Sequence, residues 1–171
     1  TRRLLDLFDA AGIKATFFVL GWVARRSPHL VREIQAAGHE IASHGCGHFD
    51  GASWPAAGWL HEFDQYSTIL REAWSINGLE EPEGWRSFAE RSIEGFRAPY
   101  LATGPGLFEA LSERGFLYDA STVSSGPAAP VDEGGLMRFA LPMIPEGPNE
   151  RPVIAMDYNL YVRHSGGEER P

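Results

Sequence analysis

The sequence predicts an α/β domain whose β-sheet is mostly parallel, and two observations indicate this fold class. Short apolar runs rich in β-branched and aromatic residues alternate with amphipathic helical segments along residues 1–119. Strands that are apolar on both faces are typical of parallel sheets covered by helices. The alternation is compatible with an open sheet and with a closed (β/α) barrel, and we expect one domain over residues 1–171.

The N-terminal part of the chain predicts helix and strand in turn. Apolar residues recur at helical spacing between Thr1, a candidate N-cap, and Gly12, a residue type that commonly follows a helix end. Residues 15–20 (Ala-Thr-Phe-Phe-Val-Leu) then predict a buried strand. The pair Ser27-Pro28, a cap followed by a proline, opens a second helix, and residues 39–43 predict the next strand.

The rest of the chain continues the alternation. A long amphipathic helix is predicted over residues 55–76, whereas the polar residues 80–90 predict a surface insertion. Residues 124–135 are rich in Gly, Pro and Ser and predict a loop. The other predicted elements are a helix over residues 106–114 and strands over residues 93–98, 116–119, 136–141 and 152–156.

Composition argues against several classes of partner. The formal net charge is -8 at pH 7 and no basic run occurs, so neither nucleic acid nor an anionic membrane surface is expected, and a neutral or cationic substrate fits better. The single cysteine, Cys46, excludes an internal disulfide framework. No apolar run approaches the roughly 20 residues that span a bilayer. The chain opens in a helical pattern without a methionine, so we expect a fragment of a longer protein.

The segment Ser-His-Gly-Cys-Gly-His at residues 43–48 places two imidazoles close together after a predicted strand. Neutral imidazole is a common ligand for zinc and other first-row metals, and a catalytic site typically uses about three protein ligands and one water. Gly45 and Gly47 predict a tight loop. His44 and His48 are therefore candidate metal ligands of an incomplete site, and the alternative is one core histidine and one exposed histidine.

Polar residues also follow two further predicted strands. Arg97 to Tyr100 close one of them, and Asp119 closes the next. Functional residues gather at the carboxyl ends of parallel strands. Candidate site residues at consecutive strand ends therefore support the metal hypothesis for the histidine pair.

Two segments of the chain resemble a known family. Residues 15–21 and 38–44 read Ala-Thr-Phe-Phe-Val-Leu-Gly and Gly-His-Glu-Ile-Ala-Ser-His, and residues 96–100, Phe-Arg-Ala-Pro-Tyr, contain an R-x-P-Y signature. Here the chain resembles the polysaccharide deacetylase family, the NodB-homology domains of carbohydrate esterase family 4. The resemblance covers roughly residues 1–119.

The resemblance implies a distorted (β/α) barrel, incomplete at both ends of this chain, that removes acetyl groups from N-acetylated sugars. It also implies a divalent metal ion, zinc, held by an aspartate and by His44 and His48 of an H-[ST]-x-x-H signature. Gly45 stands at the usual Ser/Thr position of that signature. The family's Asp-Asp motif supplies the metal-binding aspartate and the catalytic base, and we expect it upstream of Thr1.

The resemblance further implies roles around the second motif. The backbone N–H of Tyr100 would donate to the tetrahedral oxyanion, Arg97 would orient the base, and Pro99 would stiffen this corner and line the substrate site with Tyr100. A structural ion pair is the alternative for Arg97. Asp119 either supports a functional group through a hydrogen bond or serves as a turn residue.

The remaining candidates lie outside these motifs. Asp157 and Tyr158 end the last predicted strand and are candidates to line the substrate groove. The setting of His164 favours an exposed loop residue over the acid that protonates the leaving amine. Cys46 is favoured as a small loop residue over a thiolate ligand. Sugar stacking and core packing are both open for three tryptophans, Trp22, Trp54 and Trp59.

The sequence thus predicts a metal-dependent carbohydrate N-deacetylase with an N-acetylated glycan as its substrate. The alternatives are a cyclic-amide hydrolase of the allantoinase type on the same fold and a carbohydrate-binding relative without catalysis. The resemblance implies an extracellular, periplasmic or cell-envelope location and leaves a cytoplasmic one open.

Overall fold

The strands of the chain form one mostly parallel sheet with helices packed beside it. The computed structural model describes residues 1–91, 93–146 and 151–154. The strand order is β1-β2-β3-β4-β6-β5, with β7 paired to β6. Strands β1, β2, β3, β4 and β6 pair in parallel, and β5 and β7 run antiparallel to β6. The predicted α/β class with a mostly parallel sheet is confirmed.

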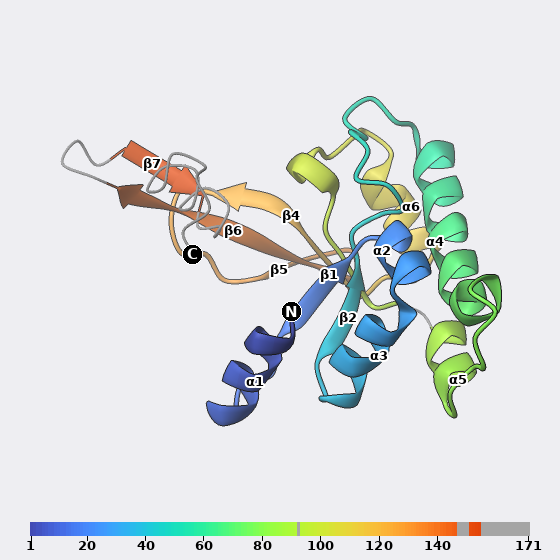
Figure 1. The fold of residues 1–171 in the computed structure, drawn as a ribbon. Helices are drawn as coiled ribbons and strands as arrows, with labels where there is room; N and C mark the ends of the chain where they lie inside the picture. The colour runs from blue at the N-terminus through green and yellow to red at the C-terminus, as the bar shows by residue number, and fades with distance from the viewer. Residues whose placement is uncertain (92, 147–150, 155–171) are drawn as a thin grey trace.

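The elements have the following bounds. The helices are α1 (Arg2–Ala10), α2 (Gly21–Arg26), α3 (Pro28–Ala36), α4 (Ala56–Ile76), α5 (Trp85–Glu90) and α6 (Leu107–Glu113), and a 3₁₀ turn, η1, spans Pro99–Leu101. The strands are β1 (Thr16–Val19), β2 (Glu40–Ser43), β3 (Gly95–Phe96), β4 (Tyr118–Ser124), β5 (Val131–Glu133), β6 (Leu136–Glu146) and β7 (Arg151–Ile154). In Figure 1, helices α2 to α6 gather on one side, and β4, β6 and β7 extend to the other.

Most predicted elements are confirmed, because their apolar periodicity matches the face that they bury. Helices α1, α3, α4 and α6 and strands β1 and β2 lie within one or two residues of their predicted ranges. Gly12 and Gly38 follow α1 and α3 with φ of 65° and 77°, a left-handed conformation that glycine adopts without steric cost. Helix α2 was not predicted, since its six residues are too short to show a period.

Two predictions for irregular segments were wrong. Residues 80–90 are not a mere surface insertion, because α5 buries Trp85 and Ala89 against α4. Part of the predicted loop 124–135 forms β5, which is exposed and pairs with the start of β6. In both segments tertiary contacts select a structure that the polar composition disfavours. Residues 155 and 156 of the last predicted strand lie outside the described residues.

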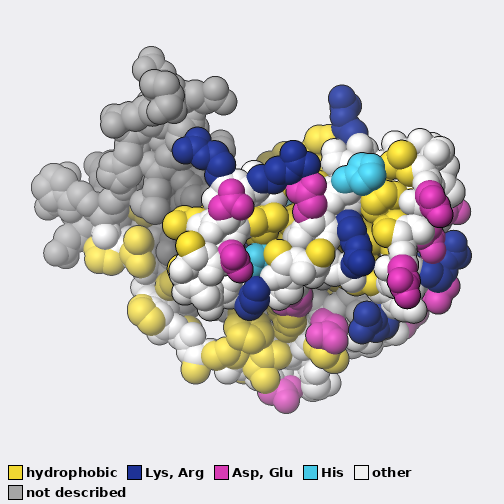
Figure 2. All heavy atoms as spheres, turned by 60° about the horizontal axis from the view of Figure 1, so that its bottom comes forward, with side chains coloured by type: hydrophobic (Ala, Val, Ile, Leu, Met, Phe, Trp, Pro, Cys, Tyr) yellow, Lys and Arg dark blue, Asp and Glu magenta, His cyan; other side chains and the backbone are white. Residues whose placement is uncertain are grey.

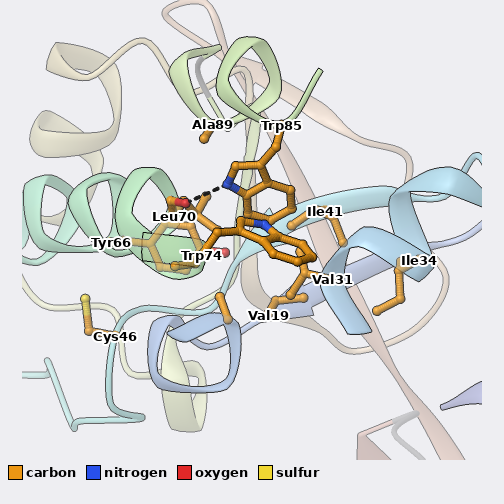
Figure 3. Packing of buried hydrophobic residues seen from close by; sticks show 12 residues of the cluster. Val19, Val31, Ile34, Ile41, Cys46, Tyr66, Leu70, Trp74, Trp85 and Ala89 are labelled. Atoms are coloured by element: carbon orange, nitrogen blue, oxygen red, sulfur yellow. Dashed lines mark hydrogen bonds between the residues drawn. The ribbon is translucent and has the colours of Figure 1, made fainter. Parts of the chain in front are cut away.

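Helix α4 links two apolar clusters that make up the core. One cluster lies under α2, α3, α4 and α5 and includes Val31, Leu70 and Trp85. The other joins α4, β3 and α6 through Trp59, Phe63 and Phe96. Figure 3 shows the first cluster, in which the indole Nε1 of Trp85 donates a hydrogen bond of 3.0 Å to the carbonyl of Leu70. The clusters therefore fix α4 relative to the sheet and to the loops at its edge.

The described surface mixes charges of both signs. Figure 2 shows the face at the bottom of Figure 1, where acidic and basic side chains alternate with exposed apolar ones. Among the described helices, none has the length and hydropathy required to cross a bilayer.

We expect Trp85→Ala to reduce the free energy of unfolding by about 3–5 kcal/mol, because it leaves a large cavity between α4 and α5. Urea denaturation followed by circular dichroism measures this. The matched control is Trp22→Ala, because Trp22 is 51% exposed, and its effect should stay within about 0.5 kcal/mol. Equal losses in the two variants would contradict the assignment of Trp85 to the core.

Candidate functional site

Backbone hydrogen bonds fix the loop that carries the two histidines, residues 44–48, against β1 and α2. The N–H of His44 donates to the carbonyl of Val19 at 3.1 Å. The N–H groups of Gly21 and Trp22 donate to the carbonyls of Gly45 and Cys46, both at 2.9 Å. The first N–H groups of a helix have no intrahelical acceptor, and here the histidine loop supplies acceptors for α2. The loop is therefore held by backbone hydrogen bonds to β1 and α2.

The two imidazoles lie side by side, with ring centroids 5.0 Å apart. Nδ1 of His44 is 2.7 Å from the carbonyl oxygen of Arg97. Because a carbonyl only accepts, Nδ1 must carry the proton, and the neutral ring keeps the lone pair of Nε2. Burial lowers the pKa of His44, and the charges of His48 and Arg97 act in the same direction, while the hydrogen bond to the Arg97 carbonyl opposes them. His44 is thus held in the form that binds metals.

The backbone at this site adopts left-handed conformations at residues other than glycine. His48, Tyr100 and Leu101 have φ of 58°, 58° and 57°. Such conformations cost on the order of 1–3 kcal/mol each and persist only where the surroundings enforce them. The ring of Tyr100 packs edge-on against that of His48, with centroids 4.5 Å apart. Strained residues from two separate loops therefore meet beside the histidine pair.

The R-x-P-Y segment forms the second wall of the site. The N–H of Arg97 donates to the carbonyl of Ser43 at 3.0 Å, and this places η1 beside the histidine loop. A Cβ on Gly45 would lie 3.7 Å from Cγ of Pro99, so the proline ring packs on that loop. Tyr100 is 70% exposed, and among the described residues no acceptor engages its backbone N–H. That N–H is free to donate to a ligand.

Arg97 is held by neutral groups. Its guanidinium carbon lies 4.2 Å from the centroid of the Phe18 ring, and Nε donates to the carbonyl of Ala120 at 2.9 Å. Burial lowers the pKa of Arg97, and the charge of Asp119 opposes that shift in part. Within the described part of the chain Arg97 forms no ion pair, and its Nη atoms donate no hydrogen bond. This geometry does not support a structural ion pair and leaves the Nη groups available to a further carboxylate.

Asp119 fixes the R-x-P-Y corner through Ser121. Oδ1 of Asp119 accepts hydrogen bonds from the N–H of Ser121, at 3.2 Å, and from its hydroxyl. The Ser121 Oγ in turn accepts the N–H of Ala98 at 2.8 Å. Asp119 is fully buried, and its Oδ2 has no hydrogen-bond partner among the described residues. Burial raises the pKa of Asp119, and the Ser121 hydrogen bonds and two nearby arginines oppose this. The observed contacts are those of a turn residue that supports the site.

Cys46 lies inside the histidine loop and is buried. Its thiol donates to the carbonyl of Glu62 with an Sγ to O distance of 3.4 Å. Burial, followed by the charge of Glu62, raises the pKa of Cys46 to about 12. The side chain is therefore a thiol at neutral pH, and this supports the small-loop-residue interpretation over a thiolate ligand.

The sequence analysis missed Glu62, which contacts the histidine loop from α4. Its side chain is buried, and Oε1 accepts the N–H of Cys46 at 2.5 Å. The signal was present in the sequence, because Glu62 lies on the buried stripe of the helix between Trp59 and Tyr66. A carboxylate on an apolar helical face rarely stays buried without a partner.

Two imidazoles with ordered partners fit part of a metal site. Within the residues described, no group of three His, Cys, Asp or Glu side chains could hold a metal ion. His44 and His48 remain two candidate ligands, and a complete catalytic site would need a further ligand and a water position.

The remaining candidate residues lie outside the two motifs. Asp157, Tyr158 and His164 lie outside the described residues, and their roles stay predictions. Trp59 is buried in the core and Trp54 packs against it, with centroids 4.9 Å apart. Trp22, by contrast, is exposed and follows Gly21 at the histidine loop.

Comparison with known proteins agrees with this geometry. The sequence profile of the family described as Polysaccharide deacetylase matches residues 1–118, which contain both motifs. The chain belongs to the polysaccharide deacetylase family. A protein of Arthroderma benhamiae, named a probable peptidoglycan-N-acetylglucosamine deacetylase, is 31% identical over 117 residues, or 66% of this chain and 23% of that protein.

Two solved structures of similar fold extend the comparison. A polysaccharide deacetylase candidate from Mycobacterium smegmatis matches with a TM-score of 0.64 and 30% identity, over 82% of this chain and 44% of that one. The Puue allantoinase matches with a TM-score of 0.58 and 27% identity, over 81% and 42%. This chain thus spans less than half the length of these relatives.

We expect Ser121→Ala to lower the free energy of unfolding by about 1–3 kcal/mol, because it leaves the Ala98 N–H without an acceptor and removes a donor to Asp119. Chemical denaturation provides the measurement. Ser112→Ala is the control, since Ser112 is exposed on α6 and its side chain makes no hydrogen bond with the residues that the structure describes. If both variants unfold at the same denaturant concentration, the hydrogen bonds of Ser121 do not stabilise the fold.

Proposed function

We propose that this chain carries part of the active site of a metal-dependent hydrolase that removes N-acetyl groups from a polysaccharide or oligosaccharide. The observation that carries the proposal is the hydrogen bond from Nδ1 of His44 to the carbonyl of Arg97. It joins the two motifs of the family at one edge of the sheet, beside His48 and Tyr100. Membership of the family and the peptidoglycan deacetylase relative support the reaction type.

His44 and His48 would hold a divalent metal ion, for which zinc suits the imidazole ligands. The third ligand in this proposal is an aspartate outside residues 1–171. When bound, the metal would polarise an amide carbonyl and lower the pKa of water, which an amide substrate requires because its carbonyl is a poor electrophile.

The remaining steps depend on residues of this chain. The backbone N–H of Tyr100, which has no acceptor among the described residues, would donate to the oxyanion that develops on the substrate carbonyl. The Nη groups of Arg97 would orient a carboxylate base through charge-assisted hydrogen bonds. Pro99 packs on Gly45 and would keep the donor of Tyr100 at a fixed distance from the histidines.

Exposed aromatic side chains next to the histidine loop favour a carbohydrate substrate. Trp22, Phe49 and Tyr100 are 51%, 56% and 70% exposed. The backbone N–H of Trp22 donates to the carbonyl of Cys46 in the loop. The ring of Phe49 covers Gly47, since a Cβ on Gly47 would lie 2.4 Å from that ring. Aromatic rings combine apolar faces with low conformational entropy and suit the apolar faces of sugar rings. Asp157 and Tyr158 remain candidate substrate-binding residues.

Opening of a cyclic amide is the second candidate reaction. The allantoinase of similar fold favours it, since it shares the fold at 27% identity. Hydrolysis of a cyclic amide would use the same imidazole pair and the same oxyanion donor. Parallel assays with N-acetylated oligosaccharides and with allantoin distinguish the two reactions by their products.

We expect His44→Ala and His48→Ala each to weaken Zn²⁺ binding by about 10-fold or more, because each variant removes one ligand of an incomplete set. Competition with a chromophoric chelator measures the affinity, and acetate release from N-acetylated oligosaccharides measures the reaction. The control His61→Ala changes an exposed histidine of α4. Wild-type zinc affinity in both His44→Ala and His48→Ala would disprove the metal assignment.

A further inference from the structure

We infer that Glu62 is a positioning residue that holds the histidine loop in its metal-binding conformation. The inference deepens the proposed function and depends on it for the role of the metal. Glu62 lies on α4, outside both sequence motifs, and contacts the loop at Cys46, midway between His44 and His48.

The contact is short and buried. Glu62 is 5% exposed, and its Oε1 accepts the N–H of Cys46 at 2.5 Å. The main chain of Glu62 adds a second link, because its carbonyl accepts the Cys46 thiol at 3.4 Å. Two hydrogen bonds thus connect one residue of α4 to the centre of the loop.

Burial of the Glu62 carboxylate has a desolvation cost. A buried carboxylate loses its hydration, and a hydrogen bond from a backbone N–H returns part of that cost. An apolar side chain at this position of the helical stripe would avoid the cost altogether. The neighbouring positions on the same stripe, Trp59, Phe63 and Tyr66, are aromatic. We therefore attribute the carboxylate at position 62 to its hydrogen bond with Cys46.

Glu62 also lies close to Gly45, which stands at the Ser or Thr position of the family signature. Gly45 has φ of 75°, and a Cβ there would lie 3.0 Å from Oε1 of Glu62. A serine or threonine would therefore crowd the carboxylate and strain the backbone. In this chain the loop lacks the hydroxyl of the signature, and a carboxylate from α4 accepts the N–H of Cys46. Gly45 and Glu62 form a matched pair.

The hydrogen bonds from α2 and to Glu62 together restrict the loop that carries both imidazoles. Helix α2 donates to the carbonyls of Gly45 and Cys46, and Glu62 accepts the N–H of Cys46. With donors and acceptors both satisfied, the loop cannot rotate without breaking hydrogen bonds. Helix α4 itself is fixed by the two apolar clusters of the core. Glu62 therefore connects the loop of His44 and His48 to the core through α4.

The test compares Glu62→Ala and Glu62→Gln in the full chain. We expect Glu62→Ala to weaken Zn²⁺ binding by about 10- to 100-fold, the usual effect of losing a group that orients metal ligands. Amide hydrogen exchange in residues 44–48 should rise in the same variant. Glu62→Gln keeps an acceptor for the Cys46 N–H and should remain within about 3-fold of wild type. The matched control is Glu72→Ala, an exposed glutamate of the same helix.

If Glu62→Ala fails to fold, Glu62→Asp replaces it, because a shorter side chain keeps the buried charge and withdraws the acceptor from Cys46. Wild-type exchange in residues 44–48 of both Glu62→Ala and Glu62→Asp would overturn the inference. So would wild-type zinc affinity in these variants alongside loss of binding in His44→Ala. Absence of zinc binding in the wild type would instead refute the proposed function, and hydrogen exchange would still decide whether Glu62 holds the loop.

Discussion

The hydrogen bond between Nδ1 of His44 and the carbonyl of Arg97 is the contact on which the rest of the site depends. Parallel pairing of β1 to β4 brings the carboxyl ends of these strands to one edge, and this bond joins the loops that follow β2 and β3. It selects the tautomer of His44 and leaves Nε2 with its lone pair. It also orients the backbone that precedes Pro99 and Tyr100. The same atom pair therefore fixes the ring of His44 relative to the backbone that leads to Tyr100.

Buried carboxylates that accept backbone N–H groups stabilise the frame around that bond. Asp119 acts through Ser121 on the N–H of Ala98, and Glu62 acts directly on the N–H of Cys46. Such buried contacts are worth more than exposed ion pairs, because water competes with them less. They lie two residues before His48 and Tyr100, whose backbone is left-handed. Hydrogen bonds therefore connect both loops of the site to the surrounding helices and strands.

Sequence patterns predicted the elements with a clear apolar period and the two strand-end motifs. Helix α4 was predictable because its buried positions repeat over 21 residues, and β1 because its run is almost entirely apolar. Trp85 was missed because it lies among Pro, Gly and Glu in a segment without a period, and only its packing against α4 shows that it is buried. Glu62 was missed because its acceptor role needs a partner 16 residues away in sequence.

By itself the sequence determined the order of the helices and strands that have a clear apolar period, the two histidines and the R-x-P-Y segment. These depend on local spacing and residue type. Only the tertiary structure decided which atoms meet. It placed the carbonyl of Arg97 on Nδ1 of His44, 53 residues apart, and assigned Asp119 to a supporting contact with Ser121. The physical reason is that hydrogen bonds between loops depend on strand register and helix packing, which no local pattern encodes.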